Sequence, residues 1–405
     1  MSAVFVQAAD ATAAEKDLAA QLPGIFARSC EQYRLLLKNA EAASTDKRPF
    51  PQSWDGEKLS MTSPEGWCSG FFPGSLWLIY EYTRDGFWKE QAERYTAIQE
   101  RIRHYAGNHD IGFMLMTSVG NALRLAPKPE YPGILLDGAA ALSTRYNEKL
   151  GVIRSWGKVD NEKEYLVIID NMMNLELLEW ASKNGGGERF DKIAQRHAEV
   201  TDRHHFRPDG SAYHVLNYNQ KTPGKILEIR AGQGASVEGT WARGHSWGIY
   251  GFTMMFRETQ NRASLMRAIR AADYLLDDAD VPEDGVPYWD HKAWGIPHEE
   301  RDASSAAVAA SALLELAQYV PEAKGAAYRA FAVKSLRSLA SPAYFAKPGA
   351  NGGFLLMHSV GSKPARIANG KGGQVNVPLN YADYYFLEAL LRFRNVAGGK
   401  PAVGR

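Results

Sequence analysis

The chain has 405 residues, of which 45% are hydrophobic and 23% are charged, the balance of a globular protein with a sizeable core. Its 47 basic and 46 acidic side chains give a net charge of +1 without a basic stripe, so we expect no nucleic-acid partner. The longest apolar runs are far shorter than the ~20 residues that cross a bilayer, so we expect no membrane partner. Two cysteines, Cys30 and Cys68, are too few for a disulfide framework.

The first residues carry a small-residue pattern that is typical of the end of an export signal. Val4 to Val6 is apolar and alanines follow at positions 8, 9 and 11, but no basic start or full apolar stretch precedes them. We therefore expect residues 1–12 to be a disordered tail or a signal remnant. We expect a soluble protein that is located in the periplasm, with the cytoplasm as the alternative location.

Helical periodicity dominates the rest of the chain, and one kind of segment recurs about six times. Each such segment is rich in Gly, Ala, Ser and apolar residues on nearly all sides, as in a helix that is buried all round. In chain order these segments run over residues 71–82, 112–125, 171–182, 244–257, 304–318 and 382–393. Each opens on a polar or glycine-containing cluster, and in a closed ring those clusters would meet at one mouth.

Helices of a second kind lie between these segments, with charges on one face and apolar residues on the other. They run over 14–38, 89–105, 189–204, 262–277 and 327–339. The alternation predicts an all-α fold, an (α/α)6 barrel or six-hairpin toroid, with residues 1–405 as a single domain. A helical-repeat superhelix is the alternative, because the period is irregular. The irregular stretches over 208–242, 282–301 and 349–378 are expected at the rim.

Asp110 and Asp170 each precede a helix of the buried kind. Capping a helix N-terminus is the commonest role of an aspartate in such a position. Asp170, however, follows the apolar run Tyr165 to Ile169, and a toroid would bring the two carboxyls toward one mouth. Apolar surroundings and a second nearby carboxylate both raise a pKa. A carboxyl kept protonated near neutral pH is suited to general acid catalysis.

The densest cluster of glycine, aromatic and polar residues runs over 232–248. Arg243 is suited to pairing with a carboxylate, and Trp241 and Trp247 to stacking on a sugar. Core packing of the tryptophans and a structural acid beside the arginine explain the same residues equally well.

Three histidines, His204, His205 and His214, show no metal-ligand spacing. No dinucleotide or phosphate-binding fingerprint is present, so we expect neither metal nor cofactor. Further along, Ser359, Ser362 and Lys363 place two hydroxyls and a cation together. They form either a cradle for sulfate or carboxylate or a solvated loop.

Taken together, these segments resemble glycoside hydrolase family 88, the unsaturated glucuronyl hydrolases. The resemblance spans about residues 67–392 and is carried by Trp67-Cys-Ser-Gly-Phe-Phe-Pro-Gly, His109-Asp-Ile-Gly-Phe, Ile168-Ile-Asp-Asn-Met-Met-Asn, Gly239-Thr-Trp-Ala-Arg-Gly-His-Ser-Trp-Gly and Val377-Pro-Leu-Asn-Tyr-Ala-Asp-Tyr-Tyr. It implies an (α/α)6 barrel in a bacterial enzyme. The implied activity removes the 4,5-unsaturated uronic acid from the non-reducing end of lyase-generated glycosaminoglycan oligosaccharides, by hydration of the C4=C5 enol ether.

The resemblance also implies roles for individual residues. Asp170 matches the general acid and base, and Asp110 matches its partner. Substrate-binding roles fall to the stacking walls Trp67, Trp156 and Trp247, to the polar contacts His214 and Gln233, to the charge contact Arg243, and to Ser359, Ser362 and Lys363, which resemble a segment that recognises sulfate in some members. Gly232 and Asn376 depart from residues common in the family, which leaves fine substrate preference open.

The expected partner is an unsaturated oligosaccharide of the chondroitin, hyaluronan or heparin type, and we expect a monomer or weak dimer. The closest alternative is an unsaturated rhamnogalacturonyl hydrolase, which acts on pectin fragments. A sugar 2-epimerase-like toroid would depend on paired histidines, for which His205 and His214 are the candidates. A non-enzymatic helical-repeat scaffold is the third alternative.

Overall fold

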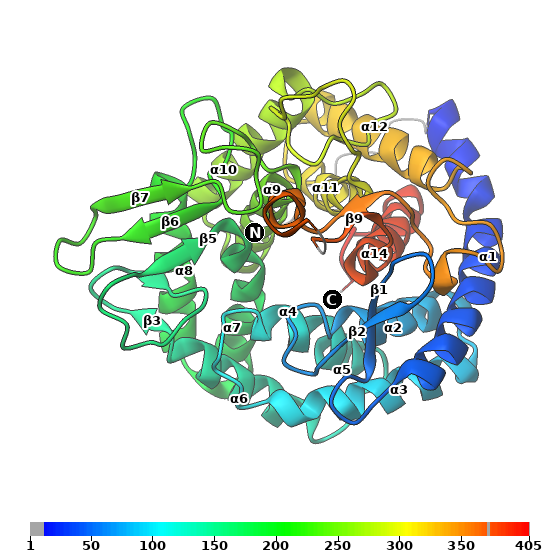
Figure 1. The fold of residues 1–405 in the computed structure, drawn as a ribbon, viewed down its shortest axis with the longest axis horizontal. Coiled ribbons are helices and arrows are strands. Elements are labelled where there is room, and N and C mark those ends of the chain that lie inside the picture. Colours follow the sequence, from blue (N-terminus) through cyan, green and yellow to red (C-terminus); the bar gives the residue numbers. More distant parts are fainter. Residues whose placement is uncertain (1–11, 371–372, 405) are drawn as a thin grey trace.

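In the computed structural model, which describes residues 12–370 and 373–404, helical hairpins close into a ring (Figure 1). Over these residues the outer layer consists of α1 (Ala13–Ala43), α3 (Gly86–Gln99), α6 (Tyr131–Ser143), α8 (Arg189–His204), α10 (Arg262–Asp273) and α12 (Glu322–Leu339). This arrangement is the predicted (α/α)6 barrel. Residues 1–11 of the expected tail lie outside the described residues, whereas Thr12 caps α1 in a reciprocal capping box with Glu15.

The inner layer follows the six predicted buried segments. It consists of α2 (Phe71–Thr83), α4 (Ile111–Leu115) continued through a π-helical turn into α5 (Asn121–Leu125), a 3-10 turn (Ile169–Asn174) continued into α7 (Leu175–Ala181), α9 (Ala242–Thr259), α11 (Ala303–Leu316) and α14 (Asn380–Ala397). Every residue of α11 is buried. Its run of alanines and serines allows α9 and α14 to pack closely on both sides.

Helix α6 completes the outer layer and is absent from the sequence prediction. Its sequence is apolar nearly all round, and Asp137 is its one charged residue. The charged face that marks the other outer helices is therefore missing.

The inner helices approach one another most closely at glycines. A Cβ on Gly112 would lie 2.5 Å from the Cα of Asn174, and a Cβ on Gly251 would lie 2.4 Å from the Cβ of Met172. The side-chain oxygen of Asn174 also accepts a 2.7 Å hydrogen bond from the backbone N–H of Phe113. These contacts fix the start of α4 against the 3-10 turn at 169–174.

We expect Gly112→Ala to lower the free energy of unfolding by about 1–3 kcal/mol, because the added methyl group overpacks this contact. Gly24→Ala is the control, since this exposed glycine within α1 has open space around it in the described structure. It should gain up to about 1 kcal/mol from helix propensity. Thermal unfolding of both variants measures the difference. A Gly112→Ala protein as stable as the control would contradict this packing.

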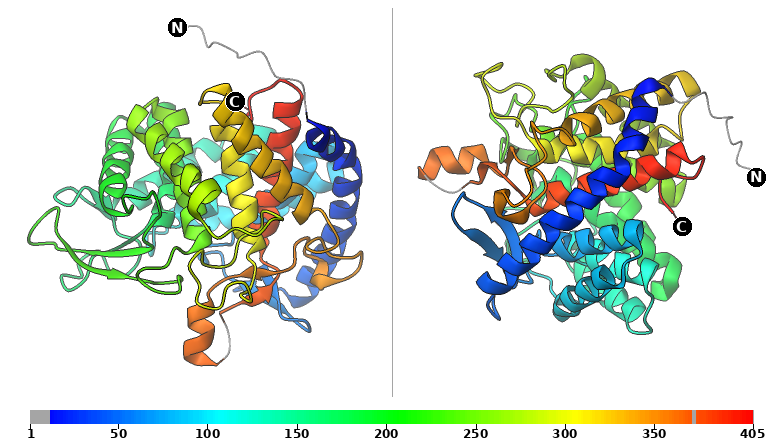
Figure 2. Two further views of the ribbon diagram at one scale, coloured as in Figure 1. Left: turned by 90° about the horizontal axis from the view of Figure 1, so that it is seen from above. Right: turned by 90° about the vertical axis from the view of Figure 1, so that its right-hand side faces the viewer.

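Short strands and one small helix cover one face of the ring (Figure 2, left). They form the hairpin β1 (Phe50–Trp54) and β2 (Leu59–Thr62), the pair β3 (Tyr146–Asn147) and β4 (Val152–Ile153), the antiparallel sheet β5 (Leu166–Ile168), β6 (Val215–Tyr218) and β7 (Ile226–Arg230), the pair β8 (Ser359–Val360) and β9 (Val375–Val377), and helix α13 (Lys363–Asn369). The predicted irregular stretches 208–242 and 349–378 supply β6 to β9 and α13, and these elements form the rim.

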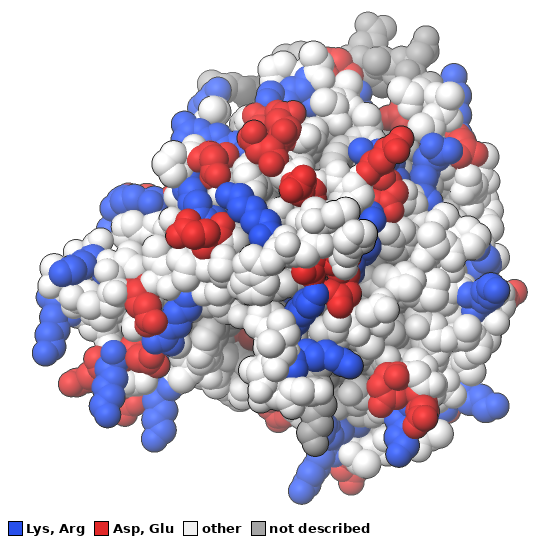
Figure 3. All heavy atoms as spheres, turned by 45° about the horizontal axis from the view of Figure 1, so that its top comes forward, with Lys and Arg blue, Asp and Glu red and all other residues white. Residues whose placement is uncertain are grey.

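Basic and acidic side chains are interspersed on the face shown in Figure 3 and form no large patch of one sign there. In the ranges that the structure covers, none of the helices is long and apolar enough to cross a membrane.

Candidate active site

Asp110 and Asp170 lie at the starts of two neighbouring inner segments. Asp110 precedes α4, and Asp170 lies in the 3-10 turn before α7. In the described chain Asp110 is the N-cap of α4 but makes no capping hydrogen bond, and the N-cap of the 3-10 turn is Ile168, so capping explains neither aspartate. Their side chains are 15% and 9% exposed.

Both carboxyls have pKa values raised to near neutral, and the charge of Asp110 raises the pKa of Asp170, so Asp110 is the first of the two to lose its proton. Burial raises the pKa of Asp110 to about 7. Burial, together with the negative charge of Asp110, raises the pKa of Asp170 to about 7, against an opposing effect of Arg243. The two carboxyls are therefore close enough to influence one another, as the toroid predicts.

Each aspartate faces a buried histidine. Nε2 of His109 lies 3.3 Å from Oδ1 of Asp110, and Nε2 of His214 lies 3.6 Å from Oδ2 of Asp170. Burial lowers the pKa of both imidazoles to about 3, so both rings are neutral. The backbone N–H of Gln233 donates to Nδ1 of His214 over 2.9 Å, which assigns the His214 proton to Nε2, on the side of Asp170.

Polar atoms at this point lack partners. Oδ2 of Asp170 and Nε2 of His214, which lie 3.6 Å apart, are buried and find no hydrogen-bond partner within the described part of the chain. Buried polar groups are normally satisfied, so this cluster is suited to the hydroxyl groups of a bound ligand.

Aromatic rings pack around the cluster. The centroid of Trp67 lies 4.8 Å from that of Tyr381, and the Trp241 ring lies 4.3 Å from the His214 ring. Trp247 is fully buried against Phe113, so its ring packs in the core.

Trp156 differs from these rings. It is 41% exposed, in the loop after β4, which leaves a ring free to stack on a ligand.

Arg243 has internal partners. Its guanidinium lies 3.0 Å from a carboxylate oxygen of Asp302, with side-chain exposures of 1% and 0%. It also donates to the carbonyls of Val360 and Gly361. The side chain of Gln233 donates to the same Gly361 carbonyl over 2.6 Å. This geometry fits the explanation, left open by the sequence, that Arg243 pairs with a structural acid. Arg243 also anchors the rim segment 360–361 to the inner layer.

The three residues expected to cradle an anion do not share one open site. Ser359 is buried in β8, and the Ser362 hydroxyl caps α13 by accepting from the N–H of Ala365 over 3.3 Å. The ammonium group of Lys363 binds the carboxylates of Glu299 and Glu300.

No metal site accompanies these residues. Among residues 12–370 and 373–404, no group of three or more His, Cys, Asp and Glu side chains is arranged to hold a metal ion. His204 and His205 end helix α8, and the ring of His205 faces the Tyr213 carbonyl at 3.4 Å.

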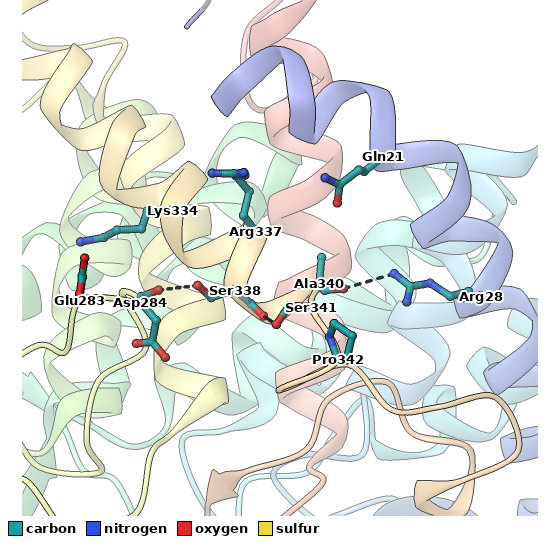
Figure 4. Close-up of a pocket in the computed structure, with 10 residues that line it drawn as sticks. All are labelled: Gln21, Arg28, Glu283, Asp284, Lys334, Arg337, Ser338, Ala340, Ser341 and Pro342. Carbon is teal, nitrogen blue, oxygen red and sulfur yellow. Dashed lines mark hydrogen bonds between the residues drawn. The ribbon is translucent and has the colours of Figure 1, made fainter. Parts of the chain in front are cut away.

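A hollow of about 800 Å³ lies elsewhere, on the outer layer (Figure 4). Among the described residues that line it are Arg28 of α1 and Lys334, Arg337 and Ser338 of α12. Arg337 reaches Asp17 in an exposed ion pair, and the hollow contains none of the candidate residues. Shifted pKa values of buried groups mark a reactive site better than a hollow alone, and they are found at Asp110 and Asp170.

Known proteins resemble this chain over most of its length, although no protein-family model matches it. It is 40% identical over 350 residues to the unsaturated glucuronyl hydrolase of Formosa agariphila, covering 86% of this chain and 85% of that protein. It is 32% identical over 350 residues to the unsaturated chondroitin disaccharide hydrolase of Streptococcus pyogenes, covering 85% of each. The crystal structure of an unsaturated glucuronyl hydrolase specific for heparin superimposes with a TM-score of 0.85 and 38% identity, over 92% of this chain and 98% of that one.

Proposed function

This chain belongs to the unsaturated glucuronyl hydrolases of glycoside hydrolase family 88, and from that membership we propose how its two aspartates divide the chemistry. The enzyme removes the 4,5-unsaturated uronic acid from lyase-generated glycosaminoglycan oligosaccharides by hydrating the C4=C5 enol ether. The observation that carries the assignment of residues is the buried pair Asp110 and Asp170, with both pKa values raised to about 7 beside unsatisfied polar atoms.

Asp170 is the general acid. Its protonated carboxyl gives its proton to C4, and the π electrons of C4=C5 form the new C–H bond, which leaves an oxocarbenium ion at C5. A water molecule bonds to C5 and returns a proton to the Asp170 carboxylate. The C5 hemiketal then opens by breaking the bond between C5 and the ring oxygen, which makes C5 a ketone and C1 a hemiacetal. Collapse of this hemiacetal to an aldehyde breaks the bond from C1 to the second sugar, which leaves with a proton as an alcohol. Ordinary glycosidases instead protonate the glycosidic oxygen.

Asp110 is the electrostatic partner. Its negative charge raises the pKa of Asp170 and so keeps the acid protonated. The same charge stabilises the positive charge that develops at C5 in the transition state. His109 and His214, both neutral, orient the two carboxyls through their ring nitrogens.

The pH dependence of kcat/KM tests this division of roles. The acid must be protonated, so kcat/KM is expected to fall as the pH rises above about 7, by up to tenfold per pH unit. Asp110→Asn removes the neighbouring negative charge and lowers the pKa of Asp170. The alkaline limb of the residual activity should then move to lower pH. An alkaline limb that stays in place in Asp110→Asn would contradict the proposed coupling.

A further inference from the structure

Two buried arginines bind backbone carbonyls where a carboxylate partner would be expected. Arg145, between α6 and β3, is 3% exposed, and Arg154, directly after β4, is 1% exposed. Within residues 12–370 and 373–404, Arg145 donates only to carbonyls, and Arg154 donates to carbonyls and to the side-chain oxygen of Gln220. Arginine is seldom fully buried unless it is paired, which distinguishes these two charges from the others of the chain.

Arg145 joins two segments of the chain near Asp110. Its guanidinium donates to the carbonyl of Ala106, four residues before Asp110, over 2.6 Å. It also donates to the carbonyls of Arg154 and Gly157, over 2.9 Å in each case. The guanidinium therefore fixes the chain that leads to Asp110 against the loop that follows β4.

The loop that this guanidinium holds contacts the segments of both aspartates. The carbonyl of Ser155 accepts a 2.8 Å hydrogen bond from the backbone N–H of His109, the residue before Asp110. The Ser155 hydroxyl accepts a 3.0 Å hydrogen bond from the backbone N–H of Ile168, two residues before Asp170. A change in the position of this loop would therefore be transmitted to the carboxyl pair.

The charge of Arg145 also acts on Asp110. Burial raises the pKa of the Asp110 carboxyl, and the positive charge of Arg145 opposes this rise. The ionisable groups near Asp110 come from several elements and are Cys68, Tyr105, His109, Arg145 and Asp170. The first three are uncharged near neutral pH, because burial raises the pKa values of the thiol and the phenol and lowers that of the imidazole. Arg145 is thus the cation of this group.

A cation that acts on only one of two neighbouring carboxyls decides which of them ionises first. Arg243 has a corresponding effect on Asp170, but its guanidinium lies 3.0 Å from the carboxylate of Asp302, which balances its charge. The guanidinium of Arg145 has carbonyls for partners and keeps its full charge. The balance of the two cations therefore favours the negative charge on Asp110 and the proton on Asp170.

We propose that Arg145 is a positioning residue of the hydration reaction: it holds the segment before Asp110 against the loop after β4, and its charge makes Asp110 the anion of the pair. The inference rests on the proposed function and deepens it. Asp170 is able to donate a proton to C4 only while the negative charge of the pair is on Asp110.

The test is the pH profile of kcat/KM for unsulfated unsaturated chondroitin disaccharide, followed by ultraviolet absorbance. The acidic limb reports the ionisation of Asp110 in the free enzyme, and the alkaline limb reports the loss of the Asp170 proton. Arg145→Gln removes the positive charge, so the acidic limb should move to higher pH by on the order of one pH unit. The maximum of kcat/KM should fall, because the two limbs approach one another.

Two further variants separate the charge from the structural role. Arg145→Lys keeps the charge but loses the planar fork that binds three carbonyls, so its activity should fall while its acidic limb stays in place. The matched control is Arg154→Gln, which removes an equally buried cation from the neighbouring residue of the same loop. It should lower the thermal stability as Arg145→Gln does but leave the acidic limb unmoved.

An acidic limb that stays in place in Arg145→Gln would overturn the proposal. A limb that moves equally in Arg154→Gln would also overturn it, because a general loss of structure would then explain the shift. If Arg145→Gln does not fold, Arg145→Lys is measured alone, and a moved acidic limb in this charged variant would contradict the proposal. A wild type that leaves every unsaturated disaccharide intact would instead contradict the proposed function itself.

Discussion

Asp170→Asn is expected to lower kcat by on the order of 10² to 10⁴ while the helical barrel stays folded. An amide of the same shape fills the same space but has no acidic proton for C4. Oδ2 of Asp170 has His214 as its neighbour at 3.6 Å and forms no cap, so little structure depends on its charge. Initial rates of absorbance loss measure the effect, with circular dichroism to verify the fold. A well-folded variant with near-normal turnover would refute the role of Asp170.

The same substitution is expected to stabilise the protein at alkaline pH. The folded-state pKa of Asp170 is raised from 3.8 to about 7, so the folded protein binds this proton more tightly than the unfolded chain. Its stabilising contribution is therefore complete below about pH 4 and is lost as the pH rises through 7. At pH 8, Asp170→Asn removes the cost of a buried charge and should raise the free energy of unfolding by on the order of 1–4 kcal/mol.

Loss of activity together with a gain of stability separates a catalytic from a structural aspartate. Asp302, which caps α11 and pairs with Arg243, provides the contrast. Asp302→Asn should lose stability at the same pH. If Asp170→Asn behaved like Asp302→Asn, Asp170 would be structural.

Arg243→Gln is expected to lower the free energy of unfolding by about 3–5 kcal/mol, because it leaves the Asp302 carboxylate buried without its cation. The carbonyls of Val360 and Gly361 lose a charged donor as well. Urea unfolding at neutral pH measures the loss.

The double variant Arg243→Gln, Asp302→Asn should recover part of this stability, since no unpaired charge remains. Arg203→Gln on α8 breaks a pair whose members are both 54% exposed and should cost less than about 1 kcal/mol. An Arg243→Gln protein that is inactive yet as stable as the wild type would favour direct contact with the substrate.

The sequence is most informative about the inner helices. A segment such as Ala303–Leu316, small or apolar on every side, has to be buried on every side, and the structure buries all of it. Helix α6 is not predicted in this way, although it belongs to the outer layer. Its single charged residue, Asp137, does not give it a polar face. Strands of two to five residues, such as β6 and β8, are too short to show an alternating pattern.

Sequence reasoning likewise identifies only part of the candidate site. Asp110 and Asp170 can be selected from sequence because their positions at the starts of inner segments repeat along the chain. The partners of Arg243 and Lys363 cannot be selected, because Asp302 and Glu299 are 59 and 64 residues away and no spacing rule links them. The Gln233 bond that sets the His214 tautomer is likewise formed only when the rim loop folds back on β6.

The most direct test of the central claim follows ultraviolet absorbance and free second sugar together, with the wild-type enzyme and unsulfated unsaturated chondroitin disaccharide. Hydration of C4=C5 predicts that absorbance is lost at least as fast as the second sugar appears, because the hemiketal must form before it opens. Release of the second sugar while the absorbance persists would show direct cleavage at the anomeric carbon. That result would contradict proton donation from Asp170 to C4.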